Sequence, residues 1–331
     1  AGGRPCPESS PARACRLPHR LTPMQLTPAP STAPSLAAAV QYLGNPLHTS
    51  LGVLLLRLLG HSPVTPTAAD LSGQVCLVTG GTAGIGAAVA KGLAQLGAEV
   101  HVTGRSEEAG ARAAKECGVV FHRVDHALVG ATAAFARSFL ADTLGGRALD
   151  CLVHNAAAMP DALALTTEGN ERAAAINVLS MYALDRALLP ALQAAPSPRC
   201  VTVVSAGMHL HPLRPEDLRA LADGTGAWGE RYDSIRAYCV THRARVLLTR
   251  LWAQEDPTVR RASVHPGWVD TPGLRGARAM RAFYALMRPA LRGAEGGADT
   301  ALWLAAGLQP EGAPNGAYWR DRAPRPADLP L

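Results

Sequence analysis

The stretch Thr79-Gly80-Gly81-Thr82-Ala83-Gly84-Ile85-Gly86 decides the fold of this chain, because it joins a strand pattern to a helix pattern. The apolar run Val75–Val78 before it is typical of a buried parallel strand. Apolar residues recur at helical spacing after it, and 99–103 predicts the next strand. A glycine-rich turn between strand and helix lets the backbone approach a pyrophosphate, which the free N–H groups of the helix N-terminus bind. The stretch therefore predicts a dinucleotide site.

Strand and helix patterns alternate from about Leu71 to the end of the chain. The predicted strands lie at 75–79, 99–103, 119–124, 151–154, 200–205 and 262–265. Helical patterns separate or follow them near 85–96, 107–117, 131–143, 168–193, 233–253 and 294–307. Such alternation predicts an α/β fold, a single Rossmann-type doubly wound parallel sheet with helices on both faces, preceded by an N-terminal extension.

Composition excludes several classes of protein. Of 331 residues, 48% are hydrophobic and 18% charged, which allows a sizeable core. The net charge is +6, but residues 1–69 hold five arginines against Glu8 and so account for +4. The nearly neutral remainder has no basic footprint for nucleic acid. Seven scattered cysteines without a CxxC pair indicate reduced thiols and no metal site.

The first seventy residues differ from the rest. Residues 1–34 are rich in Pro, Ser, Thr and Arg, like an organelle-targeting presequence, which predicts a mitochondrial or other organellar location. The alternative is an untargeted disordered arm and a cytoplasmic protein. Residues 35–70 are apolar but interrupted by Pro46 and Arg57, so they predict an amphipathic extension and not a membrane span. Residues 1–70 could contact a protein partner or a membrane surface.

The spacing T-G-x(3)-G-x-G formed by Thr79, Gly80, Gly84 and Gly86 resembles that of the short-chain dehydrogenase/reductase (SDR) superfamily. The resemblance covers roughly 71–331. Distinctive runs are similar to the orphan branch called family member 12, namely Leu251–Gln254, His265–Trp268, Gly297–Leu304 and Asp328–Leu331. The resemblance implies a nicotinamide-dependent oxidoreductase.

It also implies site residues. The catalytic set would be Asn177, Ser205, Tyr238 and His242, in which Ser205 polarises the substrate oxygen, Tyr238 passes the proton and Asn177 holds a water. The cofactor-binding residues would be Thr79, Gly80, Thr82, Gly84, Ile85, Gly86, Arg105, Asp125, Asn155, Ala156, Pro266, Gly267 and Thr271. No metal is expected, since the pair His209-x-His211 has no third ligand nearby.

His242 departs from the family pattern, which has lysine four residues after the tyrosine. The spacing puts Tyr238 and His242 on one side of a helix. A tyrosine pKa of about 10 needs a neighbouring cation before the side chain can act as a base near neutrality, and histidine, with a pKa of about 6.5, is mostly neutral there. If imidazolium replaces lysine, turnover should rise as the pH falls towards about 6. The alternative is a weakened or inactive site.

The end of the second strand indicates the cofactor. The run Val102–Ser106 contains no acid to hold a ribose 2′-hydroxyl, whereas Arg105 could fork onto a 2′-phosphate, so NADP(H) is favoured over NAD(H). Arg105 as a plain solvated charge is the alternative. Asp125 matches the family residue beside the adenine. In the family, the region 273–292 is a lid over the substrate, and its apolar residues indicate a small apolar carbonyl or alcohol. The alternative is that this region is a solvated amphipathic helix or a surface for a partner.

Two functions follow. The first is an NADP(H)-dependent carbonyl reductase or alcohol dehydrogenase. The second is a catalytically inactive, nucleotide-binding SDR-fold accessory subunit of an organellar membrane complex, favoured by His242 and by residues 1–70. Substrate identity, reaction direction and oligomeric state stay open.

Overall fold

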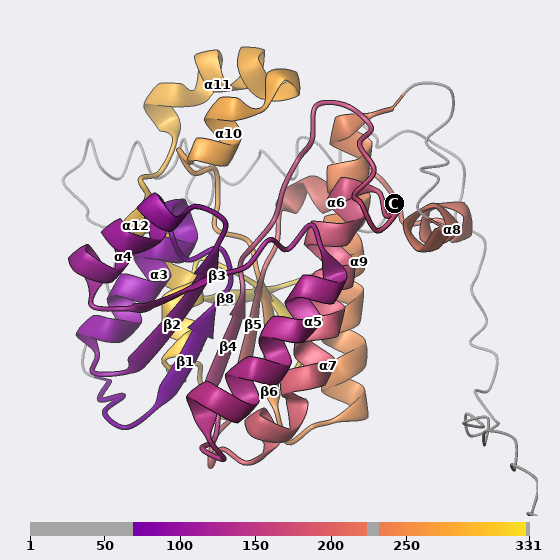
Figure 1. The fold of residues 1–331 in the computed structure, drawn as a ribbon. Helices are drawn as coiled ribbons and strands as arrows, with labels where there is room; N and C mark the ends of the chain where they lie inside the picture. The colour runs from indigo at the N-terminus through magenta and orange to yellow at the C-terminus, as the bar shows by residue number, and fades with distance from the viewer. Residues whose placement is uncertain (1–68, 224–231, 329–331) are drawn as a thin grey trace, which may run out of the picture. The chain divides into compact units, whose positions relative to one another are not determined.

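The computed structural model describes residues 69–223 and 232–328, so the predicted segment 1–34 and residues 35–68 of the predicted segment 35–70 lie outside the described residues. One sheet organises the described chain, with strand order β3-β2-β1-β4-β5-β6-β7-β8 (Figure 1). All neighbouring strands pair in parallel except β7 and β8, which are antiparallel. The bounds are β1 Val75–Val78, β2 Glu99–Gly104, β3 Val120–Arg123, β4 Cys151–His154, β5 Arg199–Val203, β6 Arg260–Val264, β7 Ala317–Arg320 and β8 Ala323–Arg325. The predicted doubly wound α/β fold is confirmed.

Helices cover both faces of the sheet (Figure 1). One face carries α3 (Gly84–Gln95), α4 (Glu107–Cys117) and α12 (Ala294–Ala305), which share a core cluster with β1, β2 and β4. The other face carries α5 (Val129–Ser138), α7 (Ser180–Gln193) and α9 (Ser234–Glu255), and α5 and α7 pack with apolar residues of β1, β4 and β5. Every residue of β1, β4 and β5 is buried, as expected of central parallel strands.

The long helical pattern at 168–193 is interrupted in the structure. Its first turns are α6 (Arg172–Ala174) and a π-helical segment η2 (Ala175–Leu179), which leads into α7. The buried Glu171 side chain fixes the start, because its carboxylate accepts hydrogen bonds from the N–H groups of Ala173 and Ala174. The span from Arg172 to Gln193 is long and apolar enough for a membrane helix, but 61% of it is buried, as in a core helix.

Smaller elements complete the described chain. They are η1 (Phe139–Leu144), η3 (Ala206–His209), α8 (Pro215–Asp223), α10 (Pro272–Gly276), η4 (Arg278–Met280), α11 (Arg281–Met287) and η5 (Arg288–Ala290). The sequence analysis did not predict β7 and β8, since both are short and β8 contains Pro324. Helices α10 and α11 stand above the carboxyl ends of the strands (Figure 1).

The sheet order reverses between β1 and β4. From β1 the chain runs outward to β2 and β3, then returns to β4 on the other side of β1. A crevice forms at such a switch point, at the carboxyl ends of the strands, and open α/β sheets bind ligands there.

Candidate active site

A cavity of about 640 Å³ opens at this edge of the sheet. Its wall includes predicted site residues from five strand ends, α9 and the turn before α3, namely Gly80, Thr82, Gly84, Ile85, Arg105, Asp125, Asn155, Ala156, Ser205, Tyr238, His242, Pro266 and Thr271. Four further predicted residues, Thr79, Gly86, Asn177 and Gly267, are not among the residues that line it. The fold therefore brings most of the predicted site to one cavity, with the others behind its wall.

Thr79 and Asn155 brace the glycine-rich turn. Thr79 Oγ1 accepts hydrogen bonds from the N–H groups of Asn155 (2.9 Å) and Ala156 (3.0 Å). The Asn155 amide donates in return to the carbonyl oxygens of Thr79 (2.9 Å) and Gly80 (3.1 Å). A Cβ on Gly86 would lie 2.4 Å from Asn155 Nδ2, so only glycine fits there. These residues hold the turn against the end of β4 and do not need to touch a ligand.

The turn leaves a place for an anion. Gly80 and Gly84 have φ values of +63° and +56°, a region that favours glycine. Helix α3 begins after Ala83, and no side chain of the described residues caps it, so its first N–H groups face the cavity beside Gly84 and Ile85. Uncapped N–H groups and the positive end of the helix dipole suit a pyrophosphate.

Arg105 and Asp125 lie at one end of the cavity. Arg105 is exposed and follows β2, and Asp125 follows β3. The Asp125 carboxylate accepts a hydrogen bond from the N–H of Ala127 (3.0 Å), which fixes its loop. Beside them His126 is held between the hydroxyls of Thr103 (2.7 Å) and Thr132 (3.2 Å), and burial lowers its pKa to about 4. This end is polar and solvent-accessible through Arg105.

Ser205, Tyr238 and His242 meet in the middle of the wall. The backbone N–H of Ser205 donates to His242 Nδ1 at 3.0 Å, and the rings of Tyr238 and His242 have centroids 4.2 Å apart. Ser205 Oγ accepts from the N–H of Gly207 at 3.1 Å. Tyr238 and His242 are one helical turn apart on α9, so both face the end of β5.

His242 is not a cation in this arrangement. Burial, with the charge of Arg245 and the proximity of His265, holds the pKa of His242 well below its usual range. Its Nδ1 must be unprotonated to accept from Ser205, and its Nε2 has no hydrogen-bond partner among the described residues. Of the two alternatives given above for His242, this arrangement does not fit an imidazolium in the place of lysine, because His242 accepts from the Ser205 backbone as a neutral ring.

The phenol of Tyr238 stays protonated near neutrality. Burial raises the pKa of Tyr238, while a hydrogen bond from Ser205 and the charge of Arg245 act in the opposite direction without cancelling it. A protonated phenol can donate a proton but cannot accept one.

Asn177 lies behind the wall and serves the backbone. Its Oδ1 accepts from the N–H of Ala158 (2.7 Å), and its Nδ2 donates to the Ala158 carbonyl (2.9 Å) and to Thr241 Oγ1 (3.0 Å). Each polar atom of its side chain is thus engaged. The geometry makes Asn177 a clamp between η2, α9 and the segment after β4, and its expected role in holding a water stays a prediction.

Arg245 is a site residue that the sequence analysis missed. Its guanidinium is fully buried and donates to the carbonyl oxygens of His154 (2.6 Å), Ala156 (2.9 Å) and Asn177 (3.0 Å). It binds no carboxylate among the described residues, and burial lowers its pKa to about 10. The available signal was its position seven residues after Tyr238, because residues at i, i+4 and i+7 share one helical face.

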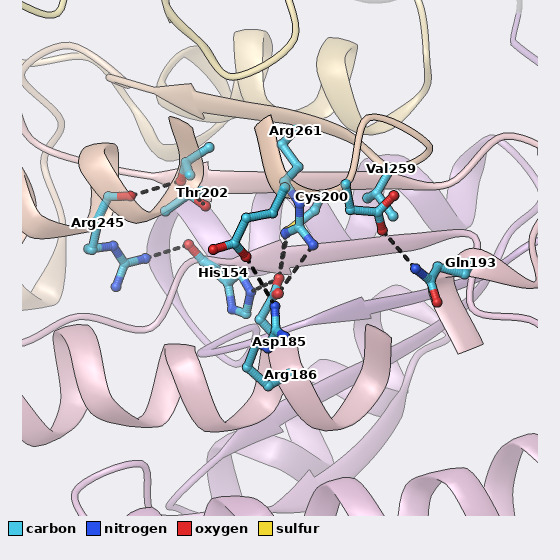
Figure 2. Close-up of polar contacts among 12 residues, drawn as sticks. His154, Asp185, Arg186, Gln193, Cys200, Thr202, Arg245, Val259 and Arg261 are labelled. Carbon is cyan, nitrogen blue, oxygen red and sulfur yellow. Dashed lines mark hydrogen bonds and ion pairs between the residues drawn. The ribbon is translucent and has the colours of Figure 1, made fainter. Parts of the chain in front are cut away.

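A buried ion pair supports this region from behind (Figure 2). Asp185 of α7 accepts two hydrogen bonds from Arg261 of β6, at 2.6 and 3.2 Å, and lies 3.4 Å from His154 Nε2. His154, Asp185 and Cys200 place ligand-type atoms within 4.8 Å of one another. Arg261 already neutralises Asp185, so we interpret the cluster as a structural network that ties α7 to the sheet and, through the His154 carbonyl, to Arg245.

The segment after β6 forms a further part of the cavity wall. Gly267 has a φ of +81°, and a Cβ there would lie 2.8 Å from Arg292 Nε. Thr271 caps α10 through a hydrogen bond from the N–H of Leu274 (3.2 Å). Leu274 and Met280, from the expected lid at 273–292, contribute apolar surface to the wall.

Comparison with known proteins agrees with this geometry. Residues 74–212 match the family model described as short chain dehydrogenase. Dehydrogenase/reductase SDR family member 12 of Homo sapiens is 36% identical over 79% of this chain and 81% of its own length, and retinol dehydrogenase 12 of Homo sapiens is 31% identical over 78% and 81%. A solved short chain dehydrogenase/reductase family protein superposes with a TM-score of 0.57 at 26% identity, over 76% of this chain and 96% of that one.

The chain belongs to the short-chain dehydrogenase/reductase family. Within it, the chain is similar to family member 12, as the runs in its C-terminal half predicted. The family uses a nicotinamide cofactor, NAD(H) or NADP(H). The uncapped start of α3, the glycines of the turn and the size of the cavity fit such a dinucleotide.

Proposed function

We propose that this protein is an NADP(H)-dependent carbonyl reductase that acts on apolar carbonyl compounds, with Tyr238 as the proton donor. The observation that supports the proposal most directly is that Tyr238 and Ser205 face the cavity that the start of α3 also enters. A proton donor and a nucleotide-binding turn thus share one wall.

The protonation state of Tyr238 favours reduction. During carbonyl reduction the oxygen gains negative charge and needs a proton, which a neutral phenol can give. During alcohol oxidation the same group must first be a phenolate. Because burial raises the pKa of Tyr238 and His242 is neutral, phenolate is disfavoured. Reduction is therefore the direction that this site supports.

Ser205 would orient the carbonyl. Its Oγ accepts from the N–H of Gly207, and its hydroxyl, which hydrogen-bonds Tyr238 in this structure, would donate to the substrate oxygen when a substrate is bound. The backbone of Ser205 is held by His242, a buried residue of α9 that accepts a hydrogen bond from the Ser205 N–H. His242 is thus a positioning residue, and preorganised donors of this kind lower the barrier by stabilising developing charge.

The cofactor would lie along the strand ends. The first turn of α3 would hold its pyrophosphate, and Arg105 would hold a 2′-phosphate, which supports NADP(H) over NAD(H). When bound, the cofactor supplies the hydride. The exposed guanidinium of Arg105 and the absence of an acid in β2 after Glu99 carry this preference.

The apolar character of the substrate is supported by the wall and by relatives. Met159, Leu210, Trp268, Leu274 and Met280 line the cavity. Relatives include proteins named retinol dehydrogenase and polyprenol dehydrogenase, whose named compounds are apolar alcohols.

The test is to follow NADPH consumption by the full chain with a panel of apolar aldehydes and ketones, and NADPH formation with the matching alcohols. The proposal expects reduction to exceed oxidation at neutral pH. It also expects Tyr238→Phe to lower reduction by at least about a hundred-fold while NADPH still binds. Bound NADPH without turnover in either direction would instead support the accessory-subunit alternative, which the neutral His242 favours.

A further inference from the structure

The charged groups of the cavity are unevenly distributed. Arg105 and Asp125 lie together at the ends of β2 and β3, where the nucleotide would begin. Burial keeps the pKa of each of the three lining histidines, at 126, 242 and 265, below the usual range, so these rings are neutral. Among the described lining residues this leaves Arg172 as the one charged side chain away from the nucleotide end.

Arg172 lies in the apolar part of the wall. It is the first residue of α6, and Ile176, one helical turn later, lines the same cavity. Helix α6 packs against α9, the helix that carries Tyr238 (Figure 1). The other residues on this side include Met159, Leu210 and Ile235. Arg172 is half-buried and lines the same cavity as these apolar residues and Tyr238.

No acid in the described part of the chain neutralises Arg172. The adjacent Glu171 is fully buried, where its carboxylate accepts from the N–H groups of Ala173 and Ala174 and from Tyr232 Oη (3.0 Å). Three other arginines with low exposure have their guanidinium groups engaged inside the protein: Arg261 pairs with Asp185, Arg292 pairs with Asp321, and Arg245 donates to three backbone carbonyl oxygens. Arg172 differs from them because its side chain lines the cavity and has no counter-ion among the described residues.

A guanidinium beside apolar surface selects a ligand with both features. Its planar fork matches a carboxylate with two parallel hydrogen bonds. The described residues that line this side of the cavity include no second cation, which matches a monoanion better than a phosphate dianion. We propose that Arg172 binds the carboxylate of the substrate, so that the substrate is an apolar carbonyl compound carrying a carboxylic acid. That the bound carboxylate belongs to a substrate rests on the proposed function. That Arg172 binds a carboxylate does not.

The test uses the full chain loaded with NADP⁺ and isothermal titration calorimetry. The probes are saturated fatty acids from hexanoic to hexadecanoic acid and the primary alcohols of the same chain lengths. We expect the acid of the best-fitting length to bind about ten- to a hundred-fold more tightly than its alcohol. Arg172→Gln should abolish this difference without weakening the alcohol, and Arg172→Lys should keep part of it. The matched control is Arg281→Gln, at an exposed residue of α11 outside the cavity wall. It should change neither the affinity for the acid nor the affinity for the alcohol.

Equal binding of acid and alcohol by the wild type, binding of neither series, or an unchanged acid preference in Arg172→Gln would each overturn the proposal. Arg172 forms no ion pair within the described residues, and unchanged NADPH binding by Arg172→Gln verifies that the variant is folded. A protein that binds the acids through Arg172 but reduces no carbonyl compound would contradict the proposed function and leave this inference standing.

Discussion

The ring of His242 accepts a hydrogen bond at Nδ1 from the backbone N–H of Ser205, at 3.0 Å. This bond requires a neutral ring, and burial keeps it neutral by holding the pKa of His242 well below its usual range. The residue in the position of the family lysine therefore supplies no charge. It fixes the serine backbone instead, and it leaves Tyr238 as a protonated phenol.

Substituting His242 with lysine should change the balance between the two reaction directions. A permanent cation beside Tyr238 lowers the phenol pKa by about 1–3 units. We therefore expect alcohol oxidation by His242→Lys near neutral pH to increase, with its pH profile shifted to lower pH. His242→Gln, which adds no charge, is the control. The same oxidation profile for lysine and glutamine would show that charge at this position does not reach Tyr238.

Substituting Arg105 should remove the preference for NADPH. The change Arg105→Gln deletes a forked, charge-assisted contact to a 2′-phosphate, so NADPH affinity should fall about ten- to a hundred-fold and NADH affinity should hardly change. Calorimetric titration of both cofactors measures this. Arg186→Gln, on a surface residue of α7, should behave like the wild type. Equal wild-type affinities for NADPH and NADH would refute the assignment.

The buried pair of Asp185 and Arg261 should be essential for stability. Both side chains are almost fully buried, so Asp185→Asn leaves the Arg261 charge uncompensated and should lower the free energy of unfolding by about 3–5 kcal/mol. Urea denaturation measures the change, with Asp142→Asn at an exposed position as control. The double variant Asp185→Leu/Arg261→Met should recover part of the loss. A single variant as stable as the wild type would mean that the pair is not buried as described.

Acid should destabilise the fold through its buried histidines. Burial lowers the pKa of His126 to about 4 and holds those of His242 and His265 well below their usual range. The unfolded chain, with histidine pKa values of about 6.5, binds more protons below that pH, so stability falls as the pH falls through it. Each histidine contributes up to about 1.4 kcal/mol per pH unit in that window. Unfolding midpoints that stay constant between about pH 7.5 and 5 would contradict the burial of these rings.

The fold was predictable because its signals are local. Apolar strands that alternate with helices, together with the turn at 79–86, specify a doubly wound sheet. This fold class does not depend on the sequences of the loops. The sequence did not predict β7 and β8 because both are short and β8 contains Pro324, and it did not predict the interrupted start of α7 because the Glu171 cap acts through burial. Tertiary packing decides such features, and sequence spacing does not show it.

The site was predictable in position but not in charge. Spacing and resemblance brought Ser205, Tyr238 and His242 together correctly. They could not show that His242 is neutral, since its pKa depends on burial between α9 and β5 and on the nearby Arg245. Arg172 and Arg245 were missed for the same reason: an arginine on a helical pattern reads as a solvated charge until the structure shows what surrounds it.

We propose that Tyr238 donates a proton as a neutral phenol, with no cation at His242 to lower its pKa. The most direct measurement is the rate of NADPH-dependent carbonyl reduction by the wild type at saturating cofactor from about pH 6 to 9, beside Tyr238→Phe. We expect a flat profile, because neither His242 nor Tyr238 titrates in that window, and we expect Tyr238→Phe to lose the rate. A rate that rises steadily towards about pH 6 would show that protonated His242 promotes the reaction, and would contradict a neutral His242.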